Sequence, residues 1–201
     1  MVNGFYNFSY GENPDKVNAI ALCSADRTPA ECGSCVNSAA QELLNLCSNH
    51  LEGIIQKEGI IWYPSCTVRY SDRYIFGRNE SQPMGGQEVS PNPILYKDAL
   101  TPFFDELRKN ASGHFGKFAY ANYKAGNSLN GQDFTVYALM QCTPDLAEGG
   151  CDDCLHQAQV FITNCCNQYP RARVFAPSCN LRYDNSSFFA PPGTRFPTHI
   201  F

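Results

Sequence analysis

The chain contains the same series of five cysteines twice, and this repeat limits the folds that are open to it. Four of the five recur at an offset of 119 positions and the last at an offset of 113. The neighbouring residues repeat as well, for example YPSCTVRY against APSCNLRY. A duplication of this length predicts two copies of one structural unit. The two series are Cys23, Cys32, Cys35, Cys47 and Cys66, and Cys142, Cys151, Cys154, Cys166 and Cys179.

The 201 residues leave room for two domains of about 100 residues each. We place the first domain at residues 1–78 and the second at residues 94–189. The stretch 79–93 is rich in Gly, Pro and polar residues, which is typical of a linker. The last residues, 190–201, have no periodicity and are expected to form an extended tail.

Each copy alternates strand-like and helix-like patterns. Residues 5–10, 117–123 and 133–141 alternate as strands do. In each copy one further strand is expected before the PSC sequence and one after it. An amphipathic helix follows each Cys-x2-Cys step, with one face expected to pack on the sheet. The fold class is therefore α+β, with helices packed on one face of an antiparallel sheet. The residues of the helix faces are Val36, Ala39, Ala40, Leu43, Leu44 and Cys47, and Leu155, Ala158, Ile162, Cys165 and Cys166.

The two copies differ at their starts. The second copy has an additional helical stretch at 94–111, whereas the first begins directly at the strand 5–10. The first copy is therefore expected to lack its N-terminal strand and helix. Either it never had them or about 30 residues are missing; without them one sheet face is uncovered, and the copy is unstable or associates with a partner. Thr101 and Pro102 are either a helix start or a kink.

Composition and sequons indicate the compartment. The net charge is −4 with 15 Lys and Arg, so a basic surface for nucleic acid is missing, and no apolar run is long enough to span a membrane. Eleven cysteines together with four Asn-x-Ser sequons favour an extracellular protein, in the apoplast or on the outer face of the plasma membrane. No signal peptide follows Met1, which we interpret as the start of a shortened sequence. The expected glycosylation sites are Asn7, Asn79, Asn110 and Asn185.

The spacing Cys-x8-Cys-x2-Cys has two chemical interpretations. A Cys-x2-Cys step is a common zinc ligand pair. The sequons, the additional cysteines and the absence of a suitably spaced His favour structural disulfides instead. We expect no metal and no cofactor.

Taken with the helix that follows and the PSC-x2-RY sequence, this spacing resembles the ginkbilobin-type domain, also called the stress-antifungal domain. Plant cysteine-rich receptor-like kinases, cysteine-rich repeat secretory proteins and plasmodesmata-located proteins carry this domain in tandem outside the cell. Both copies match, so the resemblance covers nearly all of residues 4–189. Within the family, the receptor-kinase and secretory-repeat branch is most similar to the stretch GFYNFSYGENPDKVNAIALC.

The resemblance implies a disulfide map. In the family the cysteine late in the helix pairs with one near the N-terminus of the domain. No cysteine precedes Cys23 here, so Cys47 is expected to lack its partner. Cys165 and Cys166 are either bonded to each other or both free. The implied bonds are Cys23–Cys32, Cys35–Cys66, Cys142–Cys151 and Cys154–Cys179.

The resemblance also implies a candidate sugar site. The founding seed protein of the family binds mannose through an Asn, an Arg and an acidic residue around its first and last cysteines. The second copy matches two of these positions, with Arg173 and Asp184, whereas the first copy has Ile60 and Ser71 there. The alternative is that Arg173 and Asp184 form a structural ion pair across neighbouring strands. For Arg69 and Arg182, which recur in both copies, we expect a structural role.

No enzyme motif is present: the four histidines are dispersed, and there is no phosphate-binding loop or kinase signature. Any kinase activity would lie in a segment absent from this chain. The expected function is therefore non-enzymatic recognition in plant defence or stress signalling, as part of a receptor-like kinase or a secreted relative. Expected partners are a cell-surface or cell-wall carbohydrate, or a protein such as another ectodomain. Two alternatives are a secreted mannose-binding antifungal lectin and a cell-wall or plasmodesmal protein-interaction module.

Overall fold

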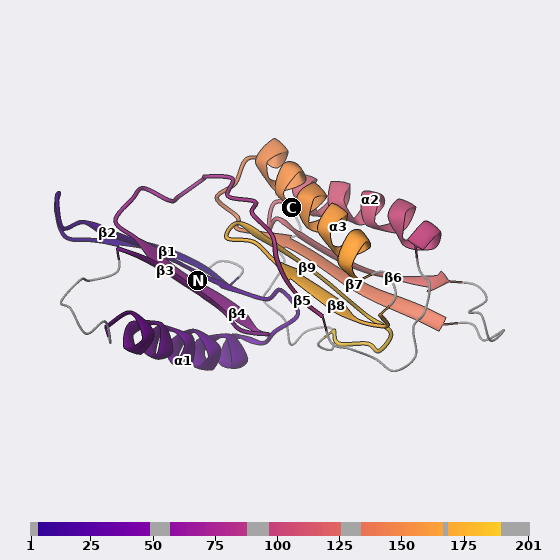
Figure 1. Ribbon diagram of the computed structural model, residues 1–201, viewed down its shortest axis with the longest axis horizontal. Coiled ribbons are helices and arrows are strands. Elements are labelled where there is room, and N and C mark those ends of the chain that lie inside the picture. Colours follow the sequence, from indigo (N-terminus) through magenta and orange to yellow (C-terminus); the bar gives the residue numbers. More distant parts are fainter. Residues whose placement is uncertain (1–3, 49–56, 88–96, 126–133, 167–168, 190–201) are drawn as a thin grey trace. The chain divides into compact units, whose positions relative to one another are not determined.

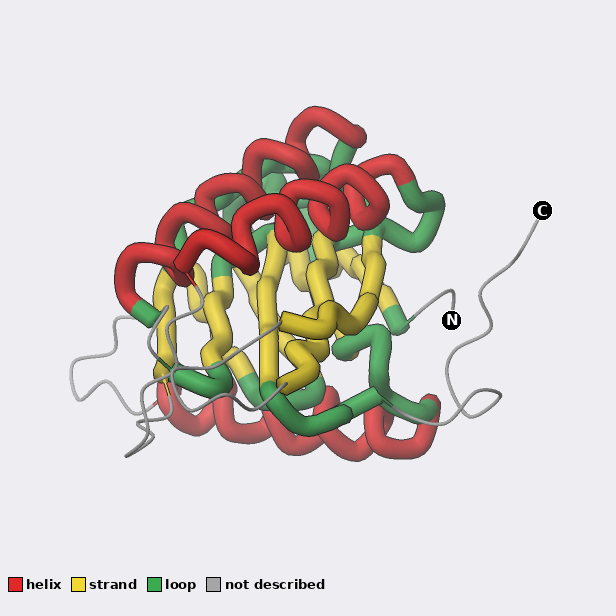
Figure 2. Tube along the Cα trace, turned by 90° about the vertical axis from the view of Figure 1, so that its right-hand side faces the viewer, coloured by secondary structure: helices red, strands yellow, loops and turns green. Residues whose placement is uncertain are grey.

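The chain folds into two compact units, which meet in sequence between Phe76 and Gly77. The computed structural model describes residues 4–48, 57–87, 97–125, 134–166 and 169–189. In each unit an antiparallel sheet is covered on one face by helix (Figures 1 and 2). The α+β class expected from the sequence is confirmed.

The described residues of the first unit form four strands and one helix. In chain order they are β1 (Phe5–Tyr10), β2 (Val17–Cys23), α1 (Pro29–Ser48), β3 (Glu58–Trp62) and β4 (Cys66–Ser71). The strands lie in the order β1-β2-β4-β3. Helix α1 starts with a capping box, in which the Glu31 carboxylate accepts from the Thr28 N–H at 2.9 Å and the Thr28 hydroxyl accepts from the Glu31 N–H at 3.3 Å. Pro29 follows as the first helical residue, where its missing N–H costs nothing.

The second unit repeats this plan and adds a strand and a helix. Its elements are β5 (Met84–Gln87), α2 (Lys97–Gly113), β6 (Phe118–Ala125), β7 (Phe134–Cys142), α3 (Glu148–Cys165), β8 (Ala172–Phe175) and β9 (Cys179–Asp184). The strand order is β5-β8-β9-β7-β6. Helices α2 and α3 lie side by side over one face of the sheet (Figures 1 and 2). Helix α2 begins before Thr101, so Pro102 lies inside the helix rather than at its start.

The strand registers of the two units are equivalent. Phe5 faces Leu22 in the first sheet as Phe118 faces Gln141 in the second. In both units the last paired position of the two central strands is a cysteine pair, Cys23 opposite Cys66 and Cys142 opposite Cys179. Strands β1, β2, β4 and β3 therefore correspond to β6, β7, β9 and β8, and α1 corresponds to α3.

The cysteines staple helix to sheet in each unit. Cys47 is the one cysteine without a disulfide, and all eleven lie in the described part of the chain. A disulfide that closes a loop of this size stabilises a small domain by about 2–4 kcal/mol. The bonds have the pairing that the resemblance implies, and the vicinal pair is closed: Cys23–Cys32, Cys35–Cys66, Cys142–Cys151, Cys154–Cys179 and Cys165–Cys166.

Two sequence expectations need correction. The stretch 79–93 was expected to be a linker, but residues 84–87 form β5, which pairs with β8 at the edge of the second sheet. Extended residues next to an open sheet edge gain backbone hydrogen bonds, which local composition does not reveal. Leu44 was expected on the core face of its helix but is 61% exposed, and Cys165 is also exposed.

Candidate functional site

The sheet face opposite the helices in the second unit carries both residues of the expected sugar site. Arg173 of β8 pairs in register with Arg182 of β9, and Asp184 lies two residues further along β9. Side chains alternate along a strand, so these three residues share one face, while Val174 and Tyr183 point to the helices. Arg173 is half-buried and Asp184 is buried.

Asp184 is held by Arg182, which we expected to have only a structural role. The Arg182 guanidinium lies 3.5 Å from the Asp184 carboxylate, and the N–H of Ser186 donates to the same carboxylate at 2.9 Å. The guanidinium also lies 3.7 Å above the ring of Phe188. A carboxylate has about four acceptor positions, so these two contacts leave capacity for a ligand hydroxyl.

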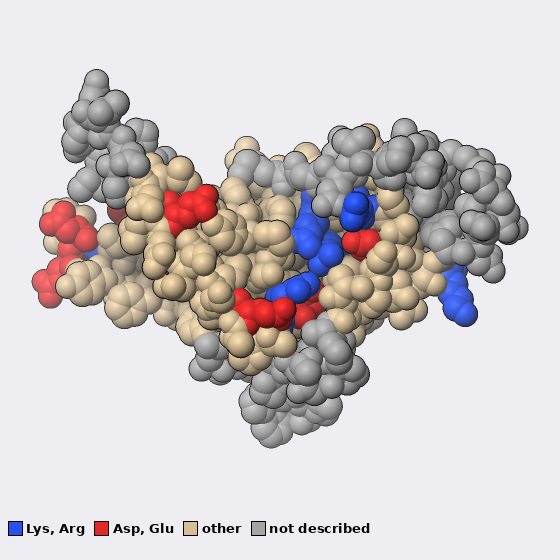
Figure 3. Space-filling view, turned by 90° about the horizontal axis from the view of Figure 1, so that it is seen from below, with Lys and Arg blue, Asp and Glu red and all other residues tan. Residues whose placement is uncertain are grey.

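This face combines donors and acceptors that suit a sugar. A guanidinium presents several N–H donors in a fixed plane, and a carboxylate accepts from adjacent hydroxyls. Figure 3 shows one side of the molecule, on which Lys and Arg side chains gather in small groups beside Asp and Glu rather than in a broad basic area. On the sheet face of the second unit, Arg182 is paired with Asp184, and this mixed charge favours a neutral polar ligand over a polyanion.

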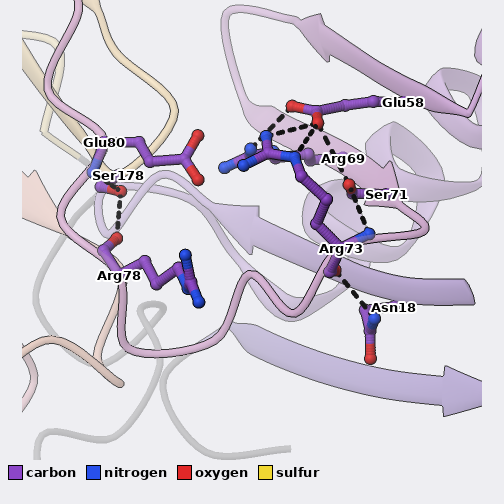
Figure 4. A network of polar contacts seen from close by, with 8 residues as sticks. All are labelled: Asn18, Glu58, Arg69, Ser71, Arg73, Arg78, Glu80 and Ser178. Carbon is purple, nitrogen blue, oxygen red and sulfur yellow. Dashed lines mark hydrogen bonds and ion pairs between the residues drawn. The ribbon is translucent and has the colours of Figure 1, made fainter.

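The equivalent face of the first unit is a closed polar network. Glu58 accepts from Arg69 Nη2 at 2.8 Å, from Arg73 Nε at 3.0 Å and from the Ser71 hydroxyl at 3.1 Å (Figure 4). The Arg69 side chain is only 3% exposed. Ile60 and Ser71 occupy the positions of Arg173 and Asp184, so the carboxylate sits on the neighbouring strand instead of on the last one.

Asn18 joins this network to the next strand. Its amide donates to the Arg73 carbonyl at 2.8 Å, and its carbonyl accepts from the Ser9 hydroxyl at 2.7 Å. Asn18 is almost completely buried. We did not single out Glu58, Arg73 or Asn18 from the sequence. Glu58 lies two residues before Ile60, so period-two alternation alone would have placed it on the face of Arg69.

The environment of Glu58 changes its acidity. Burial alone raises the pKa of this carboxyl, but hydrogen bonds from Arg73, Arg69 and Ser71 outweigh burial and hold the pKa below its usual range. The carboxylate is therefore charged at neutral pH and acts as the common acceptor of the network.

Residues 77–80 are attached to the second unit. The Ser178 hydroxyl donates to the Arg78 carbonyl at 2.8 Å and accepts from the Glu80 N–H at 2.9 Å (Figure 4). Gly77 donates its N–H to the Asp145 carboxylate at 2.7 Å. Together with β5, these bonds show that much of the expected linker is part of the second unit.

The described residues contain no metal-binding group of three or more His, Cys, Asp or Glu side chains. Among the described helices, none has the length and apolar character that a membrane crossing requires. The four sequon asparagines are all exposed: Asn7, Asn79, Asn110 and Asn185.

Two disulfide-stapled α+β units in tandem, with a polar sheet face in each, define a class of cysteine-rich repeat modules. The family described as salt stress response/antifungal (Stress-antifung) matches residues 1–73 and 84–186. The chain belongs to this family.

Curated relatives include receptor kinases and a secreted protein, all from Arabidopsis thaliana. Cysteine-rich receptor-like protein kinase 26 is 36% identical over 170 residues, which are 83% of this chain and 24% of that protein. Cysteine-rich repeat secretory protein 38 is 32% identical over 168 residues, which are 82% of this chain and 62% of that protein. The chain thus spans about a quarter of the length of this receptor kinase and of several others that it matches.

Solved structures with the same fold are tandem DUF26 ectodomains. The ectodomain of the cysteine-rich receptor-like protein PDLP8 from Arabidopsis thaliana matches with a TM-score of 0.68 at 17% identity, covering 92% of this chain and 82% of that chain. The ectodomain of PDLP5 matches with a TM-score of 0.63 at 24% identity, covering 93% of this chain and 82% of that chain. The chain is therefore an ectodomain-like module of the kind found in receptor-like kinases and secreted proteins.

Proposed function

We propose that this chain is a non-enzymatic extracellular recognition module of a plant receptor-like kinase or a secreted relative, and that it binds a carbohydrate or protein ligand in defence or stress signalling. The observation that carries the proposal is the polar face of the second sheet, where Arg173, Arg182 and Asp184 lie together. The exposure of the four sequon asparagines supports an extracellular, N-glycosylated protein.

A carbohydrate ligand is the form of this proposal that the residues favour. Arg173 supplies N–H donors, and Asp184, already oriented by Arg182 and Ser186, supplies acceptors for neighbouring hydroxyls. A side chain that is held before binding loses less entropy when the ligand arrives. If the sugar is mannose, the same residues support the alternative of a secreted antifungal lectin.

A protein-interaction module of the cell wall or plasmodesmata is the second alternative. Exposed aromatic side chains favour it, among them Tyr74 at 60% exposure in the first unit and Phe115 in the second. A protein partner would bury these rings, whereas a sugar on the polar face of the second sheet would leave them exposed.

Calorimetric titration of the glycosidase-treated chain with mannose and with mannan tests the carbohydrate form. We expect heat of binding that is lost in Arg173→Ala and kept in Lys109→Ala, which removes an exposed cation on α2, over the other face of the sheet. Absence of heat with both sugars would reject the mannose-binding alternative. Equal binding by Arg173→Ala and Lys109→Ala would show that Arg173 does not belong to the binding site.

A further inference from the structure

The polar face of the second sheet continues past Asp184 onto the two neighbouring strands. Tyr137 of β7 lies directly opposite Asp184 of β9, and Asn122 of β6 lies directly opposite Tyr137. Residues that face each other on antiparallel strands have Cβ atoms about 5 Å apart. The three residues therefore form one row across β9, β7 and β6.

The residues that flank Tyr137 and Asn122 along their strands point to the helices. Val136 and Ala138 are buried in the core of the second unit. The ring of Tyr123 stacks on a phenylalanine of α2, with 5.5 Å between the ring centroids. Because side chains alternate along a strand, Tyr137 and Asn122 lie on the opposite face, which is the polar face of this sheet.

Arg173 extends the row on the other side of β9. It lies on β8 and pairs in register with Arg182, so it is the diagonal neighbour of Asp184. We call Arg173, Asp184, Tyr137 and Asn122 the polar row. Its residues come from four adjacent strands, in the order β8, β9, β7 and β6 (Figure 1). Neighbouring strands are about 4.8 Å apart, so the row spans about 14 Å, which is longer than one sugar ring.

Exposure along the polar row rises from Asp184 toward β6. Asp184 is buried, Tyr137 is half-buried and Asn122 is exposed. The Asn122 amide can donate and accept, and Tyr137 offers both an aromatic ring and a hydroxyl. The C–H groups on one face of a sugar ring pack on an aromatic ring, while the sugar hydroxyls need polar partners at its edge. The polar row supplies both kinds of contact in sequence.

The same four places in the first unit carry neither an aromatic ring nor a charge. They are occupied by Ile60, Ser71, Asn18 and Ser9. The Ser9 hydroxyl donates to the Asn18 side-chain carbonyl at 2.7 Å, and the Asn18 amide donates to the Arg73 carbonyl at 2.8 Å. Asn18 is only 2% exposed. Hydrogen bonds within the first unit therefore use the groups that the second unit presents to a ligand.

We infer that the polar row binds a neutral oligosaccharide rather than a single sugar. Arg173 and Asp184 hold one sugar unit, Tyr137 packs against the next, and Asn122 binds the hydroxyls at the far end. The inference rests on the carbohydrate form of the function proposed above. It adds the length of the ligand and two binding residues, Tyr137 and Asn122.

Calorimetric titration with mannose and with mannotriose tests the length of the site. The full chain is treated with glycosidase, so that a glycan at the neighbouring Asn185 does not compete. We expect mannotriose to bind roughly tenfold more tightly than mannose, and Asn122→Ala to remove this difference while mannose binding stays unchanged. Asn164→Ala is the matched control, because this exposed asparagine lies on α3 over the other face of the sheet. It should change neither affinity.

Two substitutions at Tyr137 separate the ring from the hydroxyl. Tyr137→Phe keeps the ring and should still prefer mannotriose, whereas Tyr137→Ala should lose the preference. Thermal melting followed by circular dichroism shows whether Tyr137→Ala is folded, since the side chain is half-buried. If it is not folded, Asn122→Ala decides, because that position is exposed.

The outcomes distinguish the inference from the proposed function. Equal affinities for mannose and mannotriose, both lost in Arg173→Ala, would keep the sugar site and overturn the inference. Mannotriose binding that neither Asn122→Ala nor Tyr137→Ala weakens would also overturn it. Binding of neither sugar by the unchanged chain would reject the carbohydrate form of the proposed function, and the inference with it.

Discussion

Arg69 of β4 donates through Nη2 to the Glu58 carboxylate of β3 at 2.8 Å, and this ion pair organises the polar face of the first sheet. Arg73 donates to the same carboxylate from beyond the end of β4. In the second unit the equivalent arginine, Arg182, pairs instead with Asp184 on its own strand. The arginine recurs in both repeats, buried as Arg69 and half-buried as Arg182, but its acceptor comes from a different strand in each.

Glu58→Gln should destabilise the first unit by about 1–3 kcal/mol, because the almost fully buried Arg69 guanidinium would lose its charged acceptor. The measurement is urea unfolding followed by the fluorescence of Trp62, which is the only tryptophan and lies on the same strand. Glu12→Gln, the same change at an exposed turn, should shift stability by less than about 0.5 kcal/mol. If Glu58→Gln and Glu12→Gln change the free energy of unfolding equally, the ion pair of Glu58 with Arg69 contributes nothing to stability.

The same contacts predict an acid-dependent loss of stability. The pKa of Glu58 is lowered in the folded state, where hydrogen bonds from Arg73, Arg69 and Ser71 outweigh the effect of burial. The stability that the charged Glu58 carboxylate contributes is therefore complete above the ordinary glutamate pKa of about 4.3. It is lost as pH falls through the lower pKa of the folded state. The free energy of unfolding, followed by Trp62 fluorescence, should fall more steeply between pH 6 and pH 3 for the unchanged chain than for Glu58→Gln. Parallel curves would contradict the prediction.

Gly59→Ala should destabilise the first unit by about 1–3 kcal/mol through overpacking. A Cβ at this position would lie 2.9 Å from Tyr70 Cε1, and 3.1 Å from both Cys47 Sγ and Leu43 Cδ1. The second unit has Ala172 at the equivalent place, and there the counterpart of Cys47 is bonded to its neighbour.

The matched control for this prediction is Gly33→Ala, in the exposed part of α1 with open space around it. It should stabilise the unit by up to about 1 kcal/mol, because alanine is the better helix former. Trp62-detected unfolding compares the two variants, and the prediction is wrong if both move stability in the same direction.

Tyr183→Phe should destabilise the second unit by about 1–2 kcal/mol. The buried hydroxyl lies 2.6 Å from the Cys166 carbonyl and 3.0 Å from the Tyr169 carbonyl, and its removal takes one hydrogen-bond donor away from these buried acceptors at the end of α3. Differential scanning calorimetry should show a lower transition temperature while the Trp62 signal of the first unit stays unchanged. Tyr74→Phe, at a position that is 60% exposed, should leave both signals where they are.

Much of the fold could be predicted because its signals are local. The cysteine spacing indicated the repeat, period-two alternation placed the strands, and the Cys-x2-Cys step located α1 and α3. The candidate sugar residues Arg173 and Asp184 do share one sheet face. These features follow from spacing along one stretch of chain, which the backbone geometry of a strand or helix converts directly into a common face.

What the sequence by itself determined is therefore the duplicated α+β unit, its cysteine framework and the faces of its strands. Only the tertiary structure decided which partner each group receives: Arg182 for Asp184, Glu58 for Arg69, and a strand from residues 84–87 for the edge of β8. It also decided that Leu44, Phe8 and Tyr10 are left exposed, because burial depends on the elements that pack against a residue and not on its apolar character. Pairing and coverage join segments that lie far apart in the chain, so no local pattern specifies them.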